Sequence, residues 1–475
     1  MLLIRLEEKW MTKRRKHDKL HAETDRRKCC MKVRISGMEK GKACSRVIDI
    51  QKDTSRPNRE MALVCAFPEK KYQTVFGFGG AFTDAAGYVY SQMPPEIRKE
   101  TIETYFGPDS LGYTWGRTSI DSSDFGTEMY EADSDPKDEQ LEHMSFARSD
   151  RYVFPLLRDA AARAGQPMKL MLTPWSPPAY MKSNRSRVHG GKLLEEYAER
   201  WAEYMVKYVE HFLEEGMDVR LLSVQNEPNA SQTWDSCNMT GEDERQFVRC
   251  HLGPALKRHG LTDRICLLIW DHNKERAFER ALETISDEEM EQLVGGVAFH
   301  WYTGDHFDTV KMVQEQFPGK RLVFSEGCVE HSVYGNDKDL LGAVKYAHEY
   351  IGDLNHGADT LIEWNLLLDE QGGPNHVGNY CDAPLMYDRE KKQLIRKISL
   401  EYIGHFSRYL KPGSRRIGTS SWNRDLEATG VLNPDGTLAV VVLNAGKNAQ
   451  DFYLKVGEDY YPLHLDASSI LTAVL

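Results

Sequence analysis

The 475-residue chain contains no apolar run as long as about eighteen residues, so the sequence offers no candidate for a membrane-spanning helix. Its nine cysteines are an odd number without paired C-x-x-C spacing, which predicts free thiols and indicates neither a disulfide framework nor a zinc site. No H-E-x-x-H motif occurs, so we predict no metal site and no cofactor. A G-x-S-x-G elbow is also missing, which argues against a serine hydrolase.

The charge of the chain is unevenly distributed. The formal net charge of −11 argues against nucleic acid as the main partner, although residues 1–42 alone carry +8 and the remainder −19. This leader lacks the apolar segment and the small-residue cleavage site of a secretory signal. We therefore interpret residues 1–42 as a flexible extension, with Met11 or Met31 as alternative starts, and expect a cytoplasmic protein without stable membrane insertion. A tail that binds nucleic acid or an anionic surface is the alternative.

A glycine-rich stretch at 76–82, FGFGGAF, invites comparison with phosphate-binding loops. Position 82 is Phe where G-x-G-x-x-G requires Gly, and no Lys-Ser or Lys-Thr pair follows. The stretch is instead typical of a strand whose glycines allow close backbone packing.

Strands and helices alternate along most of the chain. Candidate strands lie at 76–82, 113–119, 168–173, 219–226, 265–270, 296–301, 321–326 and 358–364. The clearest helix lies at 193–216, where apolar residues recur every three or four positions and Gly216 ends the pattern. Eight strands with helices between them predict an α/β fold, a (β/α)8 TIM barrel over residues 76–412. Residues 43–75 and 413–475 contain short strand patterns and are expected to form a flanking β-sandwich from both ends of the chain.

Two of these strands end in carboxylates. VRLLSVQNEPN at 219–229 is an apolar run that stops at Glu227 and Pro228, and RLVFSEG at 321–327 ends in Glu326 and a glycine. Pro228 is expected to end the strand and to hold Glu227 in an extended conformation. Because barrel strands end at one mouth, the two carboxylates can face the same ligand, whereas either alone could be a surface glutamate.

A carboxylate pair of this kind suits hydrolysis of a glycosidic bond. One carboxyl must be neutral to protonate the leaving oxygen, and the other must be ionised to attack the anomeric carbon. A separation of roughly 5 Å between the two carboxyl groups gives retention of configuration. The sequence therefore predicts a glycosidase pair.

Six motifs occur in order along the chain: FGFGGAFTDAAG (76–87), LTPWSPPAYMK (172–182), SVQNEP (223–228), AFHWY (298–302), FSEGC (324–328) and EWNLLLDEQGGPNHVGNYCDAPLMYD (363–388). Together they resemble glycoside hydrolase family 30, the group that includes glucosylceramidase, over roughly residues 75–475. The resemblance implies a retaining mechanism in which Glu227 is the acid/base and Glu326 is the nucleophile.

The same resemblance implies a sugar-binding site. Matched position by position, the residues expected to grip the cleaved sugar are Asp84, Trp175, Asn226, Trp364 and Asn379. Three more residues are expected to support the nucleophile, and these are His300, Trp301 and Tyr302. Tryptophan faces stack on the C–H faces of sugars, although each tryptophan could instead be a core residue. His300 is expected to orient a carboxylate, and Asn226 to bind the 2-hydroxyl.

Two further expectations concern charge. Apolar surroundings and the nearby Glu326 are expected to raise the pKa of Glu227. Arg117 lies at the end of the second strand, and Asp124 follows it. This arginine could steady the charge of the nucleophile or close a structural ion pair, and the sequence leaves both roles open.

The function predicted from these residues is retaining hydrolysis of a β-glycoside by an exo-acting β-glucosidase related to glucosylceramidase, in sphingolipid or carbohydrate metabolism. The loop SQTWDSC at 231–237 departs from the animal ceramide enzymes, so an endo-β-1,6-glucanase is the main alternative. A carbohydrate-binding protein without turnover is the alternative from another class, and the intact Glu227 and Glu326 argue against it. The expected partner is a β-glucoside or an oligosaccharide, and not nucleic acid.

Overall fold

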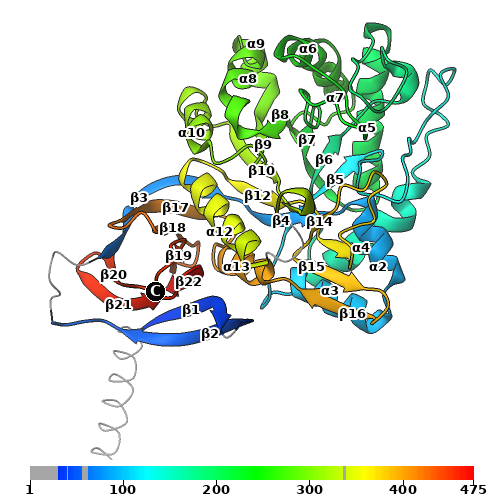
Figure 1. Ribbon diagram of the computed structural model, residues 1–475. Coiled ribbons are helices and arrows are strands. Elements are labelled where there is room, and N and C mark those ends of the chain that lie inside the picture. Colours follow the sequence, from blue (N-terminus) through cyan, green and yellow to red (C-terminus); the bar gives the residue numbers. More distant parts are fainter. Residues whose placement is uncertain (1–29, 40, 56–61, 335–338) are drawn as a thin grey trace, which may run out of the picture. The chain divides into compact units, whose positions relative to one another are not determined.

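A computed structural model describes residues 30–39, 41–55, 62–334 and 339–475 (Figure 1). The chain divides into two compact units, one spanning Tyr72–Arg416 and the other combining the residues up to Lys71 with Ile417–Leu475. Most of the expected leader, residues 1–29, lies outside the described residues. Within the described part of the chain, no helix is both long and apolar enough to cross a membrane.

The larger unit contains a closed barrel of parallel strands, so the predicted (β/α)8 fold is confirmed. In chain order the barrel strands are β4 (Gly77–Ala81), β5 (Trp115–Ile120), β6 (Lys169–Pro174), β7 (Asp218–Ser223), β8 (Cys266–Asn273), β9 (Val294–His300), β10 (Arg321–Glu326) and β12 (Thr360–Glu363). Each expected strand is present; the bounds of β10 are as expected, and the other strands have ends shifted by one to three residues. Helices surround the barrel strands (Figure 1).

Large apolar side chains fill the barrel interior. This layer is formed by Trp115, Met171, Leu221, Leu268, Ala298, Val323 and Ile362, which come from seven different strands. The first strand, β4, supplies glycine instead of a side chain: a Cβ on Gly79 would lie 2.0 Å from the carbonyl oxygen of Trp115. The glycines at 76–82 therefore serve close strand packing, as the sequence predicts.

The helices follow the strands in sequence. Their bounds are α2 (Asp84–Gln92), α3 (Pro95–Phe106), α4 (Ala147–Ala164), α5 (Ala198–Glu214), α6 (Gly241–Phe247), α7 (Gly253–Arg258), α8 (Ala277–Thr284), α9 (Glu288–Leu293), α10 (Phe307–Gln316), α11 (His331–Tyr334), α12 (Asp339–Asn355) and α13 (Ile398–Ser407). The helix expected at 193–216 corresponds to α5, which follows a 3-10 turn at Glu195–Tyr197. Gly216 has a φ of 83°, a left-handed conformation that suits glycine at the end of a helix.

Two small sheets extend from the ends of the barrel strands. β11 (Val329–Glu330) pairs with β14 (Cys381–Asp382), and β13 (Leu367–Asp369) begins a three-stranded sheet with β15 (Leu385–Asp388) and β16 (Gln393–Arg396). β11 follows β10 closely in the chain, and β13 follows β12. Residues after both barrel strands are thereby fixed by backbone pairing.

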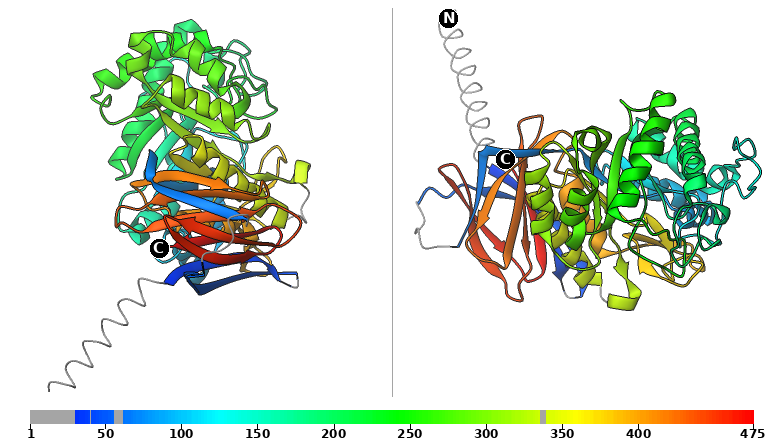
Figure 2. Two further views of the ribbon diagram at one scale, coloured as in Figure 1. Left: turned by 90° about the vertical axis from the view of Figure 1, so that its left-hand side faces the viewer. Right: turned by 90° about the horizontal axis from the view of Figure 1, so that it is seen from above.

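The second unit is a nine-stranded sheet built from both ends of the chain, as predicted. Its order is β2 (Lys42–Gln51), β1 (Cys30–Glu39), β22 (Ser469–Val474), β19 (Leu438–Asn444), β18 (Leu426–Leu432), β17 (Ser414–Ser421), β3 (Leu63–Val75), β20 (Gln450–Val456) and β21 (Asp459–Leu465). Figure 2 shows the first strands, in blue, beside the last strands, in red. A bridge between Asp53 and Tyr460 joins the two edges, so the sheet curls around its core.

The expected boundary of the leader is wrong. Residues 30–39 form strand β1, which pairs with both β2 and β22. Met31, Val33 and Ile35 are buried in the core of the sheet, at alternate positions of the strand. Charged residues between and around them hid this two-residue period in the sequence.

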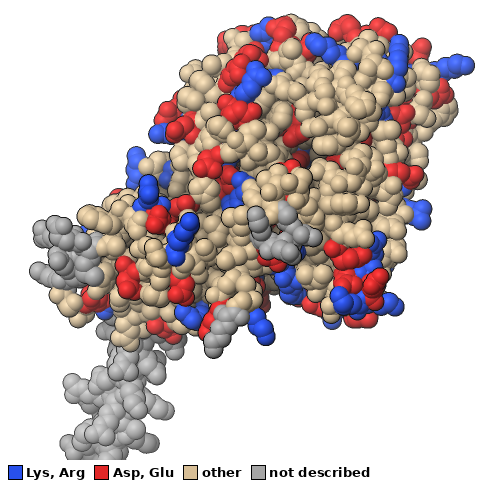
Figure 3. All heavy atoms as spheres, viewed as in Figure 1, with Lys and Arg blue, Asp and Glu red and all other residues tan. Residues whose placement is uncertain are grey.

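The surface carries charge of both signs. On the face shown in Figure 3, blue basic and red acidic side chains are interspersed. A nucleic-acid site requires clustered basic side chains to neutralise phosphates, and this face shows no such cluster among the described residues.

Candidate active site

A pocket of about 200 Å³ opens at the C-terminal ends of the barrel strands. Both predicted catalytic glutamates, Glu227 and Glu326, line it. The other lining residues are Asp124, Phe125, Trp175, Asn226, Gln232, Trp234, His272, Asn273, Tyr302, Cys328, Glu330, Trp364, Asn379 and Cys381. Side chains coded far apart in the sequence thus meet at one mouth, as the barrel topology requires.

Glu227 lies just beyond β7 and is held by its backbone. Its N–H donates to the carbonyl of Asp271 over 2.9 Å, and the N–H of Asn226 donates to Pro174 over 2.9 Å. Glu227 has a φ of 44°, so the expected extended conformation before Pro228 is wrong. The bond to Asp271 ties this turn to the neighbouring strand β8 and outweighs the local preference for an extended residue before proline.

Glu326 ends β10 and is held by two donors. The Arg117 guanidinium donates to Oε2 over 2.5 Å, and the Tyr302 hydroxyl donates to Oε1 over 2.9 Å. Arg117 is fully buried and also donates to the Asn226 amide oxygen over 2.8 Å and to Asp271 over 3.1 Å. Of the two roles that the sequence left open for Arg117, direct contact with the expected nucleophile is therefore present, together with a structural ion pair.

His300 lies between the two glutamates. Its Nδ1 is 3.2 Å from Oε1 of Glu227, whereas its Nε2 is 3.1 Å from Oδ1 of Asp271 and 3.9 Å from Oε2 of Glu326. Burial alone would lower the pKa of His300, but the charges of Glu326, Asp271 and Glu227 raise it to about 9. The imidazole of His300, at the end of β9, thus lies within 4 Å of carboxylates at the ends of β7, β8 and β10.

The pKa of Glu227 differs from the expectation. Burial raises it, but the hydrogen bond with His300 and the positive charges of His272, His300 and Arg117 outweigh burial and lower it below the usual range. The predicted rise is therefore wrong for this structure. The sequence predicts Glu326 as a negative neighbour of Glu227, but it does not show that two histidines from other strands lie beside the Glu227 carboxylate.

Aromatic and amide side chains form the rest of the predicted sugar site. Trp175 and Trp364 line the pocket and stack on each other, with ring centroids 5.2 Å apart. Arg117 lies over both rings, 4.7 and 5.3 Å from their centroids. Asn226 and Asn379 also line the pocket, so these four predicted residues come together.

Asp84 is not among the residues that line this pocket, and its expected sugar contact stays a prediction. Its two carboxylate oxygens accept from Nε and Nη2 of Arg148, over 2.7 and 2.8 Å. It is the first residue of α2 and is buried there against Arg148. Asp124 lies at the pocket in its place, and it accepts from the amides of Asn375 and Asn379 over 3.0 and 3.2 Å.

Asp124 also has a perturbed pKa. Burial, together with the negative charges of Glu326 and Glu227, raises its pKa to about 7 despite the hydrogen bonds from Asn375 and Asn379. A buried carboxyl that faces a cavity is a candidate acceptor for sugar hydroxyls.

Trp301 and His300 are both buried beside the catalytic glutamates. Trp301 packs against Phe324 and Tyr346, and a Cβ on Gly327 would lie 2.7 Å from its ring. Neighbouring residues at a strand end point to opposite sides, which turns Trp301 away from the pocket that Tyr302 lines. Trp301 thus packs beside the residue that follows Glu326, and its expected support of the nucleophile stays a prediction. His300 is fully buried and reaches Glu227, not the nucleophile, at hydrogen-bond distance.

Among the polar residues that line the pocket, the sequence did not identify Gln232, His272, Asn273 and Glu330 as binding residues. His272 and Asn273 belong to β8, whose expected end at 270 was three residues too early. Gln232 lies in the loop 231–237, which the sequence singled out as a departure from the animal ceramide enzymes. Polar residues at the end of a barrel strand are the signal that could have identified His272 and Asn273.

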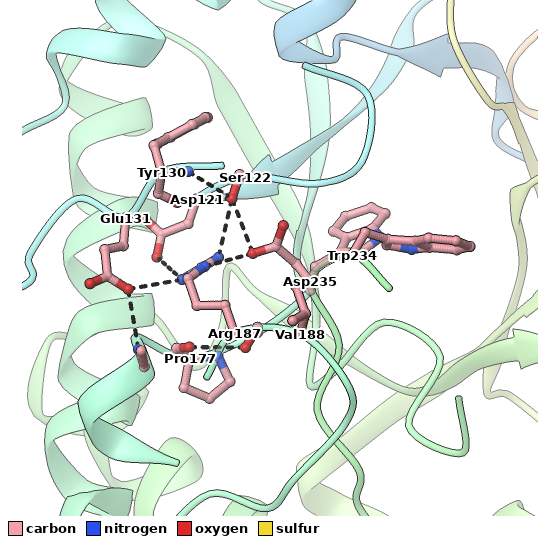
Figure 4. Close-up of polar contacts among 12 residues, drawn as sticks. Asp121, Ser122, Tyr130, Glu131, Pro177, Arg187, Val188, Trp234 and Asp235 are labelled. Atoms are coloured by element: carbon pink, nitrogen blue, oxygen red, sulfur yellow. Dashed lines mark hydrogen bonds and ion pairs between the residues drawn. The ribbon is translucent and has the colours of Figure 1, made fainter. Parts of the chain in front are cut away.

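A buried ionic cluster holds the loop that carries Trp234 (Figure 4). Arg187 donates to Asp235 over 2.6 Å and to Asp121 over 3.2 Å, and it lies 3.6 Å from Glu131. We name these four residues the Arg187 cluster. Backbone pairing reinforces it, because the residue after Arg187 forms a β-bridge with Asp235. The cluster thereby fixes the residue that follows Trp234.

Family models match both units of the chain. Residues 75–410 match the glycosyl hydrolase family 30 TIM-barrel domain, and residues 413–473 match the family 30 beta sandwich domain. A putative glucosylceramidase 4 from Caenorhabditis elegans is 32% identical over 393 residues, which span 79% of this chain and 75% of that protein. Lysosomal acid glucosylceramidase from Mus musculus is 31% identical over 409 residues, which span 82% of this chain and 78% of that protein.

Solved structures resemble the whole fold. SrfJ from Salmonella typhimurium has a TM-score of 0.88 and 36% identity, covering 94% of this chain and 99% of its own. The endo-beta1,6-glucanase BT3312 has a TM-score of 0.83 and 25% identity, also covering 94% of this chain and 99% of its own. The carboxylates at the barrel mouth and the match to both domain models lead to one conclusion: this chain is a glycosidase that belongs to glycoside hydrolase family 30.

Proposed function

We propose that the protein is a retaining, exo-acting β-glucosidase of the glucosylceramidase type. The observation that carries this proposal is that Glu227 and Glu326 line one pocket with His300 between them. The curated relatives from Caenorhabditis elegans and Mus musculus, which bear the name glucosylceramidase, support the choice of substrate.

In the proposed reaction Glu326 attacks the anomeric carbon while Glu227 protonates the leaving oxygen. Arg117 and Tyr302 aim the attacking carboxylate. Water then cleaves the glycosyl ester, with Glu227 acting as base. Asn226, beside the acid/base and lining the pocket, would bind the 2-hydroxyl.

The proton that Glu227 must donate is held within its hydrogen-bonded pair with His300. In this structure the pKa values of the two groups favour imidazolium and carboxylate. A sugar that enters the pocket excludes water, and a neutral pair is less costly to hold there than an ion pair. Substrate binding would thus favour transfer of the proton from His300 to Glu227, where the leaving oxygen can take it.

Glucose recognition is assigned to the pocket residues Asp124, Asn379, Trp175 and Trp364. Asp124 and Asn379 would bond to sugar hydroxyls, and Trp175 with Trp364 would cover an apolar face of the ring. The volume of about 200 Å³ is below the roughly 300–1,000 Å³ typical of drug-sized ligand sites, which favours one sugar over a long chain.

An endo-β-1,6-glucanase is the second candidate. The structural likeness to such a glucanase supports it, and so does the polar lining contributed by Gln232, His272 and Glu330, which suits a hydroxylated leaving group. Products separate the two candidates. An exo-acting enzyme releases only glucose from short β-1,6-glucan oligosaccharides, whereas an endo-acting enzyme gives a ladder of shorter oligosaccharides.

Replacing Glu326 with glycine tests the proposal. We expect the variant to lose turnover of an aryl β-glucoside by roughly a thousandfold or more, because no nucleophile remains. Azide or formate should restore turnover by entering the space left by the carboxylate, and azide should yield the α-glucosyl azide. Glu103→Gln, a change in a half-exposed glutamate of α3, is the matched control and should keep parental activity. Near-full activity of Glu326→Gly without added anions would refute the assignment of the nucleophile.

A further inference from the structure

The expected acid/base is also part of a group of metal-ligating side chains. Glu227, His272 and His300 offer ligating atoms that all lie within 4.8 Å of one another. Oε1 of Glu227 is 3.2 Å from Nδ1 of His300 and 3.7 Å from Nδ1 of His272. Ligands at the usual bond lengths around tetrahedral zinc are separated from each other by about 3.3 Å. We propose that these three residues bind a divalent transition-metal ion such as Zn²⁺, which inhibits the enzyme by occupying its acid/base.

The three ligands stand on neighbouring parts of the barrel. Glu227 follows β7, His272 belongs to β8 and His300 ends β9, and these strands pair consecutively. The sequence predicted no metal site because it contains no H-E-x-x-H motif and the two histidines are 28 positions apart. Barrel closure, and not local spacing, brings the ligands together.

A carboxylate behind His300 prepares the ring for metal binding. Oδ1 of Asp271 lies 3.1 Å from Nε2 of His300 and also accepts from the Ser325 hydroxyl over 2.6 Å. Carboxylate–histidine pairs of this kind fix the proton on one ring nitrogen and leave the other free to ligate. A metal ion at Nδ1 would displace the second proton of the ring, which His300 shares with Glu227 when no ion is bound.

His272 supplies a second imidazole, with Nδ1 as its ligating atom. Its Nδ1 is buried and makes no hydrogen bond among the described residues. Glu227 and His272 both line the pocket, so an ion could enter from it and keep water in its remaining positions. Three protein ligands with an open position form a common zinc coordination set.

The donor set selects the class of ion. Two imidazoles and one carboxylate suit Zn²⁺, Cu²⁺, Ni²⁺ or Co²⁺, whereas Mg²⁺ and Ca²⁺ prefer a shell of oxygens. An ion bound to Glu227 would occupy the oxygen that protonates the leaving group and part of the space for the substrate. Inhibition by Zn²⁺ should therefore compete with the glycoside.

Binding is measured without reference to activity. Isothermal titration of the full chain with Zn²⁺ should show one site, and Co²⁺ should give visible absorption bands that added Zn²⁺ removes. His272→Gln should weaken Zn²⁺ binding by roughly a hundredfold, since loss even of a residue that supports a ligand costs about 10- to 100-fold. Circular dichroism and thermal unfolding establish that the variant is folded.

His464→Gln is the matched control. His464 is a half-exposed histidine of β21 that pairs with Asp451 and Asp466. Its replacement should leave the tight site unchanged. The proposal is overturned if His272→Gln binds Zn²⁺ as tightly as the parent chain, or if His464→Gln weakens binding equally.

The inhibitory effect rests on the proposed function, and the two parts can fail separately. With an aryl β-glucoside, Zn²⁺ should raise KM and leave kcat unchanged, and His272→Gln should shift the inhibitory concentration by the same factor as the binding constant. Cobalt bands without any glycosidase activity would leave the metal site intact and refute the function. Glycosidase turnover without metal binding would refute the metal site and leave the proposed function intact.

Discussion

Arg117 and Arg187 are both buried, and each contacts carboxylates from several segments of the barrel unit. Arg117 is paired with Glu326 and Asp271, while Arg187 is paired with Asp121 and Asp235. In both places an arginine compensates carboxylates that have been removed from water.

The two sites differ in where their carboxylates point. Asp121 is fully buried and accepts from the hydroxyls of Tyr204 and Tyr208 and from the N–H of Ala132. Glu326, in contrast, lines the pocket. Arg187 therefore holds a loop through a carboxylate that is enclosed by protein. Arg117 instead holds a carboxylate that a ligand in the pocket can reach.

Glu227→Gln, at the reaction centre, should have the largest effect on activity of the changes considered for the two regions. The amide keeps the shape of the acid but has no proton to give, so we expect kcat/KM to fall by roughly 10²- to 10⁴-fold on an alkyl β-glucoside. The loss should be much smaller on a nitrophenyl β-glucoside, whose leaving group departs without protonation. Steady-state kinetics on both substrates measure the ratio. Equal losses on the two substrates would show that Glu227 is not the acid.

Arg187→Ala should lower the free energy of unfolding, whereas Glu227→Gln lowers the reaction rate. Removing one partner of a buried ion pair leaves uncompensated charges, which costs about 3–5 kcal/mol of the free energy of unfolding. Denaturant unfolding, monitored by tryptophan fluorescence, measures the loss. Arg163→Ala is the control, because Arg163 and Glu103 form a pair of half-exposed side chains worth at most about 1 kcal/mol. If both variants lost the same free energy of unfolding, the Arg187 cluster would not stabilise the loop more than a surface ion pair does.

The reaction centre should also respond to pH through His300. Its folded pKa of about 9 lies above the ordinary value of 6.5, so its contribution to stability is full below pH 6.5 and is lost as the pH rises through 9. The contribution is on the order of 3 kcal/mol and is shared with Glu227, whose lowered pKa reflects the same ion pair. Unfolding free energies at pH 6.5 and 9 measure it.

His300→Gln tests the origin of that slope. The amide can still bond to Glu227 and Asp271 but does not titrate, so the variant should lose most of the decline in stability between pH 6.5 and 9. An unchanged slope would assign the effect to another group in contact with this network, of which His272 is the nearest.

The barrel was predictable because each strand combines an apolar run with a sharp end. Glu227 and Glu326 could be placed for the same reason, since strand ends of a barrel meet at one mouth. The surroundings of these residues were not predictable. His272 and His300 reach Glu227 from other strands, and a pKa depends on such neighbours instead of on local sequence.

The surroundings of Asp84 were not predictable for a similar reason. Asp84 and Asp124 each follow a barrel strand, and the sequence does not show the direction of either side chain. Arg148, which binds Asp84, stands in α4, 64 positions farther along the chain. Only the packed structure shows that one aspartate is bound by an arginine and the other faces the pocket.

Asp124→Asn and Asp84→Asn test this difference between the two aspartates, and their expected effect on kcat/KM is the smallest of those predicted. Loss of a buried acceptor at the pocket should cost about 1–3 kcal/mol, or roughly 5- to 150-fold in kcat/KM. Asp84→Asn breaks an ion pair with Arg148 away from the pocket, so it should lower the unfolding free energy and leave kcat/KM close to the parental value. Kinetics and denaturant unfolding of both variants give the comparison. If Asp84→Asn lowered kcat/KM as much as Asp124→Asn, Asp84 would have to leave Arg148 when the sugar binds, and the assignment made from the sequence would be right.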